Sequence, residues 1–194
     1  MPRVEQRLFD QKRAFAGSFA NPVQKGIFEQ HPIAKMPGES AIYDFVLDGL
    51  NGQPIDLQQF RGKKMLIVNT ASECGYTAQY AQLQALHETF NGEVAVIGCP
   101  SNDFGNQEPG TADQIARFCE TRFGVTFPLS AKMRVTGPGR HALYAWLEEQ
   151  SPADGAVSWN FQKFLVDQSG AVTQVFAPSQ DPLSDPVLTA LGLL

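Results

Sequence analysis

The chain has 194 residues, of which 43% are hydrophobic, and it carries a formal net charge of −5 with a pI of about 5.2. This length and apolar content suit one well-cored domain and are rather short for two. The negative charge and the lack of a Lys/Arg cluster argue against nucleic acid as a partner. The longest apolar runs are far too short for a transmembrane helix.

The cysteine count bears on the compartment. Three cysteines, Cys74, Cys99 and Cys119, are an odd number for a chain of this size. They do not suggest the disulfide framework of a secreted protein, so we expect free or reactive thiols in a reducing compartment, the cytoplasm. The three histidines lack ligand spacing with any cysteine, so the sequence offers no support for a metal site.

The first 40 residues differ in character from the rest. Basic and acidic residues are mixed there, without the apolar core of a signal peptide. We expect a flexible or loosely docked N-terminal extension over residues 1–40 and a single compact domain over residues 41–194. Two alternatives stay open for the extension: a targeting segment, or sequence upstream of a true start at Met36.

In chain order, the domain begins with an alternating segment, 42–47, that predicts a strand. Asn51-Gly52 then favours a hairpin turn. The apolar run 65–68 predicts a buried strand, and a helical pattern follows Cys74 and ends near Asn91-Gly92. The β-branched segment 93–98 predicts another strand, so residues 65–98 form a strand–helix–strand unit with parallel pairing.

The second half of the domain continues this alternation. A polar loop over 101–110 precedes a capping-box signal at Thr111–Gln114, which starts a helix through about Arg122. A third helix is expected over 139–149. Segments 164–167 and 171–176 flank turn residues and predict a closing hairpin. The chain therefore predicts an α/β fold, a three-layer sandwich with a mixed central sheet flanked by helices, as in thioredoxin-like proteins.

Cys74 is the strongest candidate for chemistry. It lies in a strand-to-helix turn, close to the positive end of the following helix, where backbone N–H groups favour an anion. The thiolate is the reactive form of cysteine, so this placement indicates redox or nucleophilic chemistry. The alternative is a small residue that only closes a tight turn.

Four segments together resemble the glutathione peroxidase family, in its cysteine-containing, thioredoxin-dependent branch. Segment 68–77 is similar to the one that carries the family's peroxidatic residue, and segment 98–110 resembles its second signature loop, GFPCNQFGxQEPG. Segment 118–128 resembles the region where two-cysteine members keep a resolving cysteine, and segment 159–165 resembles WNFxKFL. The resemblance covers about residues 42–190, and the four motifs occur in the family's order.

By position, the resemblance implies specific roles. Cys74 matches the peroxidatic residue, Gln107, Trp159 and Asn160 match the rest of a catalytic tetrad, and Cys119 matches the resolving cysteine. In the family the resolving helix moves or partly unwinds to let the two cysteines pair. The residues alone favour the simpler alternatives, in which Trp159 is a buried aromatic, Asn160 a turn former, Gln107 an ordinary loop residue and Cys119 a core residue.

The implied function is that of a thiol peroxidase that reduces hydrogen peroxide and organic hydroperoxides. A Cys74–Cys119 disulfide would be recycled by thioredoxin or glutathione, with no cofactor. The alternative is a peroxide sensor that passes oxidation to a partner protein. Departures from the family's motifs are Ala78, Cys99, Ser101 and Asp103, and the last puts a negative charge into the candidate loop. A short segment over 147–158 implies a monomer or weak dimer.

Overall fold

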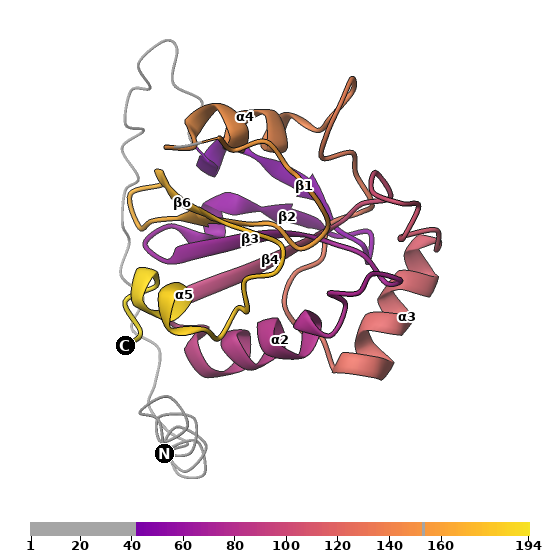
Figure 1. The fold of residues 1–194 in the computed structure, drawn as a ribbon, viewed down its shortest axis with the longest axis horizontal. Coiled ribbons are helices and arrows are strands. Elements are labelled where there is room, and N and C mark those ends of the chain that lie inside the picture. The colour runs from indigo at the N-terminus through magenta and orange to yellow at the C-terminus, as the bar shows by residue number, and fades with distance from the viewer. Residues whose placement is uncertain (1–41, 153) are drawn as a thin grey trace, which may run out of the picture. The chain divides into compact units, whose positions relative to one another are not determined.

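The computed structural model describes residues 42–152 and 154–194 (Figure 1). The expected extension, residues 1–40, and the alternative start at Met36 lie outside the described residues. Within them, a four-stranded sheet has the order β4-β3-β5-β6, and a two-stranded sheet pairs β1 with β2.

The central sheet is mixed, as predicted. Strands β3 (Lys64–Thr70) and β4 (Val94–Pro100) are parallel and are joined by helix α2 (Gln79–Phe90). Strand β5 (Lys163–Val166) pairs antiparallel with β3 and with β6 (Val172–Phe176). Strands β3 and β4 are almost wholly buried, which explains why their sequences are continuous apolar runs.

Helices cover both faces of this sheet. Helix α4 (Ala142–Gln150) lies on one face, and α2 and α5 (Asp185–Ala190) lie on the other (Figure 1). The core on the α4 side combines Met65 and Ile67 of β3 with Leu143, Tyr144 and Leu147 of the helix. Successive residues of a strand point to opposite faces of the sheet, so the same short strands contribute side chains to the core beneath the helices on both faces. The three-layer α/β sandwich expected from the sequence is confirmed.

Helix α3 (Ala112–Phe123) begins with the predicted capping box. The Gln114 N–H donates to Thr111 Oγ1, and the Thr111 N–H donates to Gln114 Oε1 over 2.8 Å. Gly124 ends the helix in the left-handed conformation, at φ 62°. Only Ile115 and Cys119 of α3 are buried, so the helix packs on the domain through a narrow stripe.

The N-terminal strand prediction was partly wrong. Residues Ile42–Asp44 form a 3-10 helix (η1), and only Val46–Asp48 form a strand, β1. Ile42 and Tyr43 are both buried although they are neighbours, an arrangement that a strand with one buried face cannot provide. The hairpin prediction is confirmed, because β1 pairs antiparallel with β2 (Pro54–Asp56) across the turn that holds Asn51 and Gly52.

A second short 3-10 helix, η2 (Leu57–Phe60), leads from β2 into β3. The closing hairpin of β5 and β6 is confirmed, but the sequence interpretation missed α5 beyond it. Its signal was present in Ser184 as N-cap and Pro186 in the first turn.

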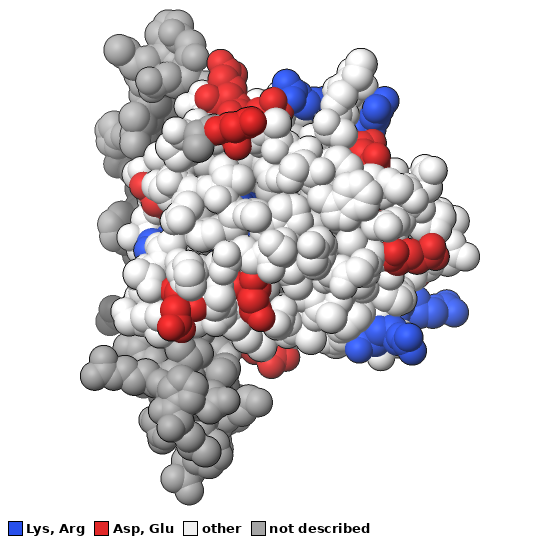
Figure 2. Space-filling model, in the orientation of Figure 1, with Lys and Arg blue, Asp and Glu red and all other residues white. Residues whose placement is uncertain are grey.

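The surface charges of the described residues are interspersed. Figure 2 shows acidic side chains scattered over the face toward the viewer, with basic side chains standing out at the end where α3 lies and along the upper edge. Among residues 42–152 and 154–194, no helix is both long and apolar enough to cross a membrane.

Candidate active site

Cys74 lies in the loop between β3 and α2, as predicted. Its N–H donates to Thr77 Oγ1 over 3.0 Å, and the Thr77 hydroxyl donates to the Ala71 carbonyl over 2.9 Å. The Thr77 N–H also donates to the Cys74 carbonyl, over 3.0 Å. Thr77 therefore fixes the turn from which the thiol projects, and the thiol is half-buried.

A donor from this turn reaches the sulfur. The Tyr76 N–H donates to Cys74 Sγ over 3.4 Å. Helix α2 itself starts only at Gln79, so the expected support from the helix N-terminus is less direct than the sequence suggested. The Tyr76 N–H therefore supplies the backbone hydrogen bond that the structure gives to the sulfur.

Gln107 lies in the loop that follows β4. Its carbonyl accepts a hydrogen bond from the Glu73 N–H over 3.0 Å, which joins this loop to the residue next to Cys74. The loop turns tightly through Gly105 and Asn106, both with positive φ. The Asn102 side chain accepts from the Glu108 N–H over 2.8 Å and holds the loop closed.

Asn160 meets Gln107 directly. Its side-chain Nδ2 donates to Gln107 Oε1 over 2.9 Å, and the Asn160 side chain is fully buried. Because Oε1 of Gln107 accepts this bond, the amide nitrogen is the end of Gln107 left to donate. The alternative that Gln107 is an ordinary loop residue does not explain this contact with a residue 53 positions away.

Trp159 stands at the rim of the same region. Its ring packs against Phe104 at 5.4 Å between centroids, and 38% of the residue is exposed. The buried-aromatic alternative is therefore wrong for Trp159, since a core ring would be covered. Its carbonyl accepts from Asn69 Nδ2 over 3.0 Å, which ties residue 159 to the end of β3.

Asp103, the acidic departure from the family motif, is held by groups that neutralise its charge. Its carboxylate accepts from the N–H groups of Val135 and Thr136, over 2.7 Å and 3.1 Å, and lies 3.5 Å from Arg134 Nε. These donors satisfy the carboxylate within the loop and the facing segment. The Asp103 carboxylate therefore stabilises the local structure through these hydrogen bonds and the ion pair.

Cys119 is buried in α3, so the core interpretation describes its resting position. Burial raises the pKa of its thiol to about 11, a shift that the nearby Glu108 charge reinforces and a hydrogen bond with Tyr80 opposes. Cys74 and Cys119 are both free thiols in this structure. Cys99 is buried among core residues of the α4 face, and burial raises its pKa to about 11 as well.

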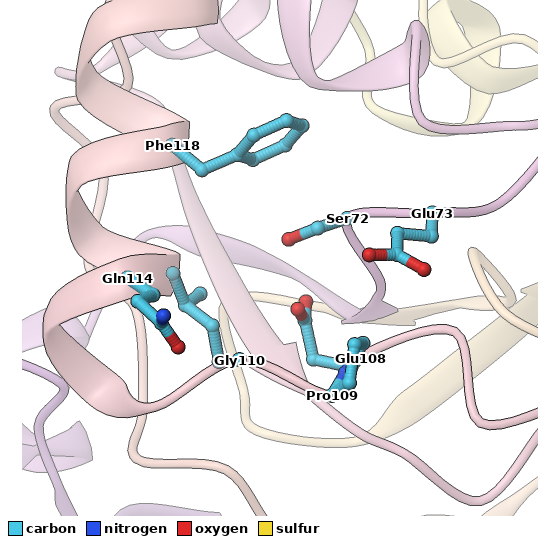
Figure 3. A pocket seen from close by; sticks show the side chains of 8 residues that line it. Ser72, Glu73, Glu108, Pro109, Gly110, Gln114 and Phe118 are labelled. Atoms are coloured by element: carbon cyan, nitrogen blue, oxygen red, sulfur yellow. The ribbon is translucent and has the colours of Figure 1, made fainter.

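A cavity of about 420 Å³ separates the Cys74 loop from α3. Figure 3 shows Phe118 projecting from α3 toward the loop of Ser72, and the Glu108 side chain rising toward the same loop. Glu108 is fully buried, and burial raises the pKa of its carboxyl, while the Ser72 hydroxyl and the Lys132 charge oppose that shift. The sequence interpretation gave Glu108 no role, because a loop glutamate ordinarily faces solvent.

Metal ligation finds no candidate here. Over the described ranges 42–152 and 154–194, no group of three or more His, Cys, Asp or Glu side chains could hold a metal ion. The hydrogen bond that reaches the thiol of Cys74 comes from the Tyr76 N–H, and Gln107 is linked to the residue next to Cys74 through the Glu73 N–H.

Comparison with known proteins identifies the family. The family model for glutathione peroxidase matches residues 42–148, which include Cys74, Gln107 and Cys119 and end before Trp159. The chain belongs to the glutathione peroxidase family. The resemblance predicted from four sequence motifs is thereby confirmed, and the family is one of peroxidase oxidoreductases.

Individual relatives agree with this assignment. The hydroperoxy fatty acid reductase gpx1 of Synechocystis is 47% identical over 152 residues, which cover 74% of this chain and 90% of the relative. The crystal structure of T. cruzi GPX1 has a TM-score of 0.62 at 31% identity, covering 79% of this chain and 97% of that one. A thioredoxin-family thiol:disulfide interchange protein from Chlorobium tepidum has a TM-score of 0.58 at 18% identity, covering 76% and 93%, which supports the thioredoxin-like fold.

Proposed function

We propose that this protein is a thiol peroxidase whose peroxidatic residue is Cys74. The thiolate attacks one oxygen of a hydroperoxide, the O–O bond breaks, and the sulfur becomes a sulfenic acid while an alcohol or water leaves. The observation that carries this proposal is the continuous hydrogen bonding from the Cys74 turn through Glu73 and Gln107 to Asn160. It joins three distant segments around one half-buried thiol.

Gln107, Trp159 and Asn160 supply the donors that this step requires. Negative charge moves from sulfur to the leaving oxygen, and that oxygen must receive a proton. The Trp159 indole and the amides of Gln107 and Asn160 can stabilise both charges without adding a formal charge of their own. The partial exposure of Trp159 leaves a route for substrate to approach from solvent.

Cys119 is proposed as the resolving residue. Its thiol condenses with the Cys74 sulfenic acid, a disulfide forms and one water leaves. A thioredoxin dithiol, or alternatively glutathione, then reduces the disulfide and is itself oxidised, so that no bound cofactor is required. Since Cys119 is buried in the resting structure, α3 has to shift before this step.

The proposed substrates are hydrogen peroxide and organic hydroperoxides. The Synechocystis relative is named for its action on hydroperoxy fatty acids. Tyr76 and Trp159 are among the exposed large hydrophobic residues of the described chain, and both belong to the segments around Cys74. Their apolar surfaces suit the carbon chain of an organic hydroperoxide. We further propose that the protein acts in the cytoplasm as a monomer or weak dimer.

Steady-state turnover tests this function. Peroxide consumption is measured with thioredoxin and with glutathione as reductant, for hydrogen peroxide and for a fatty acid hydroperoxide. We expect turnover with thioredoxin, and none in Cys74→Ser because a serine hydroxyl is a far poorer nucleophile than a thiolate near neutral pH.

Appreciable turnover of Cys74→Ser would overturn the proposal. Stoichiometric oxidation of the wild type without turnover on either reductant would favour the alternative role, a sensor that relays oxidation to a specific partner.

A further inference from the structure

Lys163 is a buried lysine that the proposed mechanism does not use. It is the first residue of β5, at the end of that strand nearest Trp159 and Asn160, and it has no exposed surface. A lysine is almost never fully buried unless its ammonium group is paired. The burial of Lys163 therefore requires hydrogen-bond partners for its ammonium group.

The Lys163 ammonium group donates to three backbone carbonyls. Its Nζ lies 2.7 Å from the Phe161 oxygen, 3.2 Å from the Pro178 oxygen and 3.4 Å from the Ala177 oxygen. An ammonium has three donors, so this set can satisfy it completely. The carbonyls come from both sides of the β5–β6 hairpin, and Lys163 therefore ties these two chain segments together.

The first of these carbonyls belongs to an unusual residue. Phe161 has φ 67°, in the left-handed region that non-glycine residues rarely adopt. Such a conformation is strained and persists only where its surroundings hold it. The Phe161 N–H donates to the Asn69 carbonyl over 2.6 Å, and its carbonyl accepts from Lys163. The turn that presents Trp159 and Asn160 is thus held at both polar groups of Phe161.

The second carbonyl leads to the Cys74 side of the site. The Pro178 oxygen also accepts from Gln79 Nε2 over 2.8 Å. Gln79 is the first residue of α2, and its own N–H donates to the carbonyl of Tyr76, the residue whose N–H reaches the Cys74 sulfur. The short segment 177–178 is therefore hydrogen-bonded to both the Trp159–Asn160 turn, through Lys163, and the start of α2.

We propose that Lys163 is a positioning residue, which holds the Trp159–Asn160 turn in place relative to the Cys74 turn through the shared segment 177–178. The role rests on the proposed function of Trp159 and Asn160, and it goes beyond it by naming the group that keeps their donors aimed. Lys163 itself does not touch the reacting atoms. Its hydrogen bonds keep the Trp159–Asn160 turn and the Cys74 turn at a fixed distance from each other.

The charge environment of Lys163 fits this role. Burial lowers the pKa of Lys163 to about 7, a shift opposed by the Asp181 carboxylate in the segment after β6. A neutral amine still carries N–H donors, so the group keeps a link to the carbonyls when it loses its proton. A methionine of similar length would fill the same space and donate nothing.

The test is carried out in a Trp146→Phe background, where Trp159 is the one remaining tryptophan. The variants are Lys163→Met, Gln79→Met and their combination. Lys64→Met is the matched control, since Lys64 Nζ donates to the Ala190 carbonyl from the start of β3, at the other end of that strand from the site. Three quantities are measured: the single-turnover rate of Cys74 oxidation by hydrogen peroxide, the Trp159 fluorescence and the melting temperature.

We expect Lys163→Met to slow Cys74 oxidation roughly tenfold to a hundredfold and to shift the Trp159 emission, because small misplacements of catalytic groups cost rates of that size. Gln79→Met should have a smaller effect, and the double variant should be less than additive because both side chains act on Pro178. Lys64→Met should leave the rate and the emission unchanged.

A folded Lys163→Met protein with wild-type rate and emission would overturn the inference. If Lys163→Met does not fold, full additivity between Gln79→Met and the shorter donor Lys163→Gln would overturn it instead. Failure of the proposed function would give a different result. In that case Cys74 of the Trp159→Phe variant would be oxidised at the wild-type rate, independently of the residue at position 163.

Discussion

Asn160 Nδ2 and Gln107 Oε1 are 2.9 Å apart, although the two residues are separated by 53 positions in the chain. One comes from the loop after β4 and the other from the turn before β5. Their hydrogen bond orients both amides at once, because the donor end of Asn160 and the acceptor end of Gln107 are fixed by the same contact. The two residues therefore act as a unit, and a change in either disturbs both.

Gln107→Ala and Trp159→Phe should each slow the oxidation of Cys74. Loss of one preorganised donor commonly costs about 10²–10³ in rate, and redundancy among the three donors would reduce that figure. Stopped-flow oxidation of the reduced enzyme by hydrogen peroxide measures the step without the recycling reactions.

Trp146→Phe is the matched control for the tryptophan. Trp146 lies on α4 and packs against Phe45 at 6.0 Å, away from the loops around Cys74, so its rate should equal that of the wild type. Wild-type rates in both Gln107→Ala and Trp159→Phe would show that these side chains have a structural role only.

Cys119→Ser should consume about one equivalent of peroxide and then fail to turn over with thioredoxin. Without a resolving thiol, the Cys74 sulfenic acid persists after that first equivalent, and excess peroxide then oxidises it to sulfinic acid with consumption of a second equivalent. Mass spectrometry of the peroxide-treated wild type should detect a Cys74–Cys119 disulfide.

Cys99→Ser is the control for this experiment, since Cys99 is also buried but lies in the core of the α4 face. It should continue to turn over. Detection of a Cys74–Cys99 disulfide would assign the resolving role to Cys99 and contradict the present proposal.

The lowered pKa of Lys163 predicts that the stability of the protein depends on pH. Its pKa is about 7 in the folded protein, against an ordinary value of 10.5, so between these values the unfolded chain binds more protons at this position. The contribution of Lys163 to the free energy of unfolding therefore rises with pH across about 7 to 10.5, by at most ~1.4 kcal/mol per pH unit. Lys163→Met should lack this rise.

The measurement is urea unfolding of both proteins at about pH 6.5, which lies just below this window, and at about pH 8 and 9.5, which lie within it. Taking the difference between the two proteins removes the titration of every other group. A difference in unfolding free energy that stays constant with pH would mean that the lysine is not shifted in the folded state.

Glu73→Lys should modestly accelerate the alkylation of Cys74 below neutral pH. A carboxylate next to a thiol disfavours the thiolate, and a lysine favours it. Glu73 is exposed, and exposed charges are screened within about 10 Å at 0.1 M salt, so the gain should shrink as salt is added.

Glu93→Lys makes the same charge change at an exposed position just before β4, at the opposite end of the parallel strands. It should leave the alkylation profile unchanged. An unchanged profile in Glu73→Lys as well would mean that its side chain faces away from the sulfur.

Much of the fold follows from local sequence. The apolar runs of β3 and β4 and the periodic helix between them are strong signals, because both strands are buried on two faces. The segment 42–47 misled the interpretation, since its apparent alternation hides two neighbouring buried residues in a 3-10 helix. Tertiary burial, which no local pattern encodes, determines the structure there.

The candidate site was predictable in part. Cys74, Gln107, Trp159 and Asn160 were found through motif resemblance, and the hydrogen bond between Gln107 and Asn160 adds to that case. The burial of Lys163 could not be read from the sequence, because its acceptors are backbone carbonyls at positions 161, 177 and 178. Backbone acceptors carry no side-chain signature.

Helix α3 carries its own caps at both ends, through Thr111 and Gln114 at its start and Gly124 at its finish. The Gln114 N–H at its start and the Cys119 and Glu120 carbonyls at its end therefore have partners within the helix and its adjoining turns, whether or not the helix is docked. In the proposed mechanism, Cys119 would then reach Cys74 by separation of the packing around Ile115 and Cys119 rather than by the melting of helical hydrogen bonds. The far-ultraviolet circular dichroism of the oxidised enzyme should accordingly match that of the reduced enzyme, while hydrogen exchange at the surfaces that α3 covers should increase.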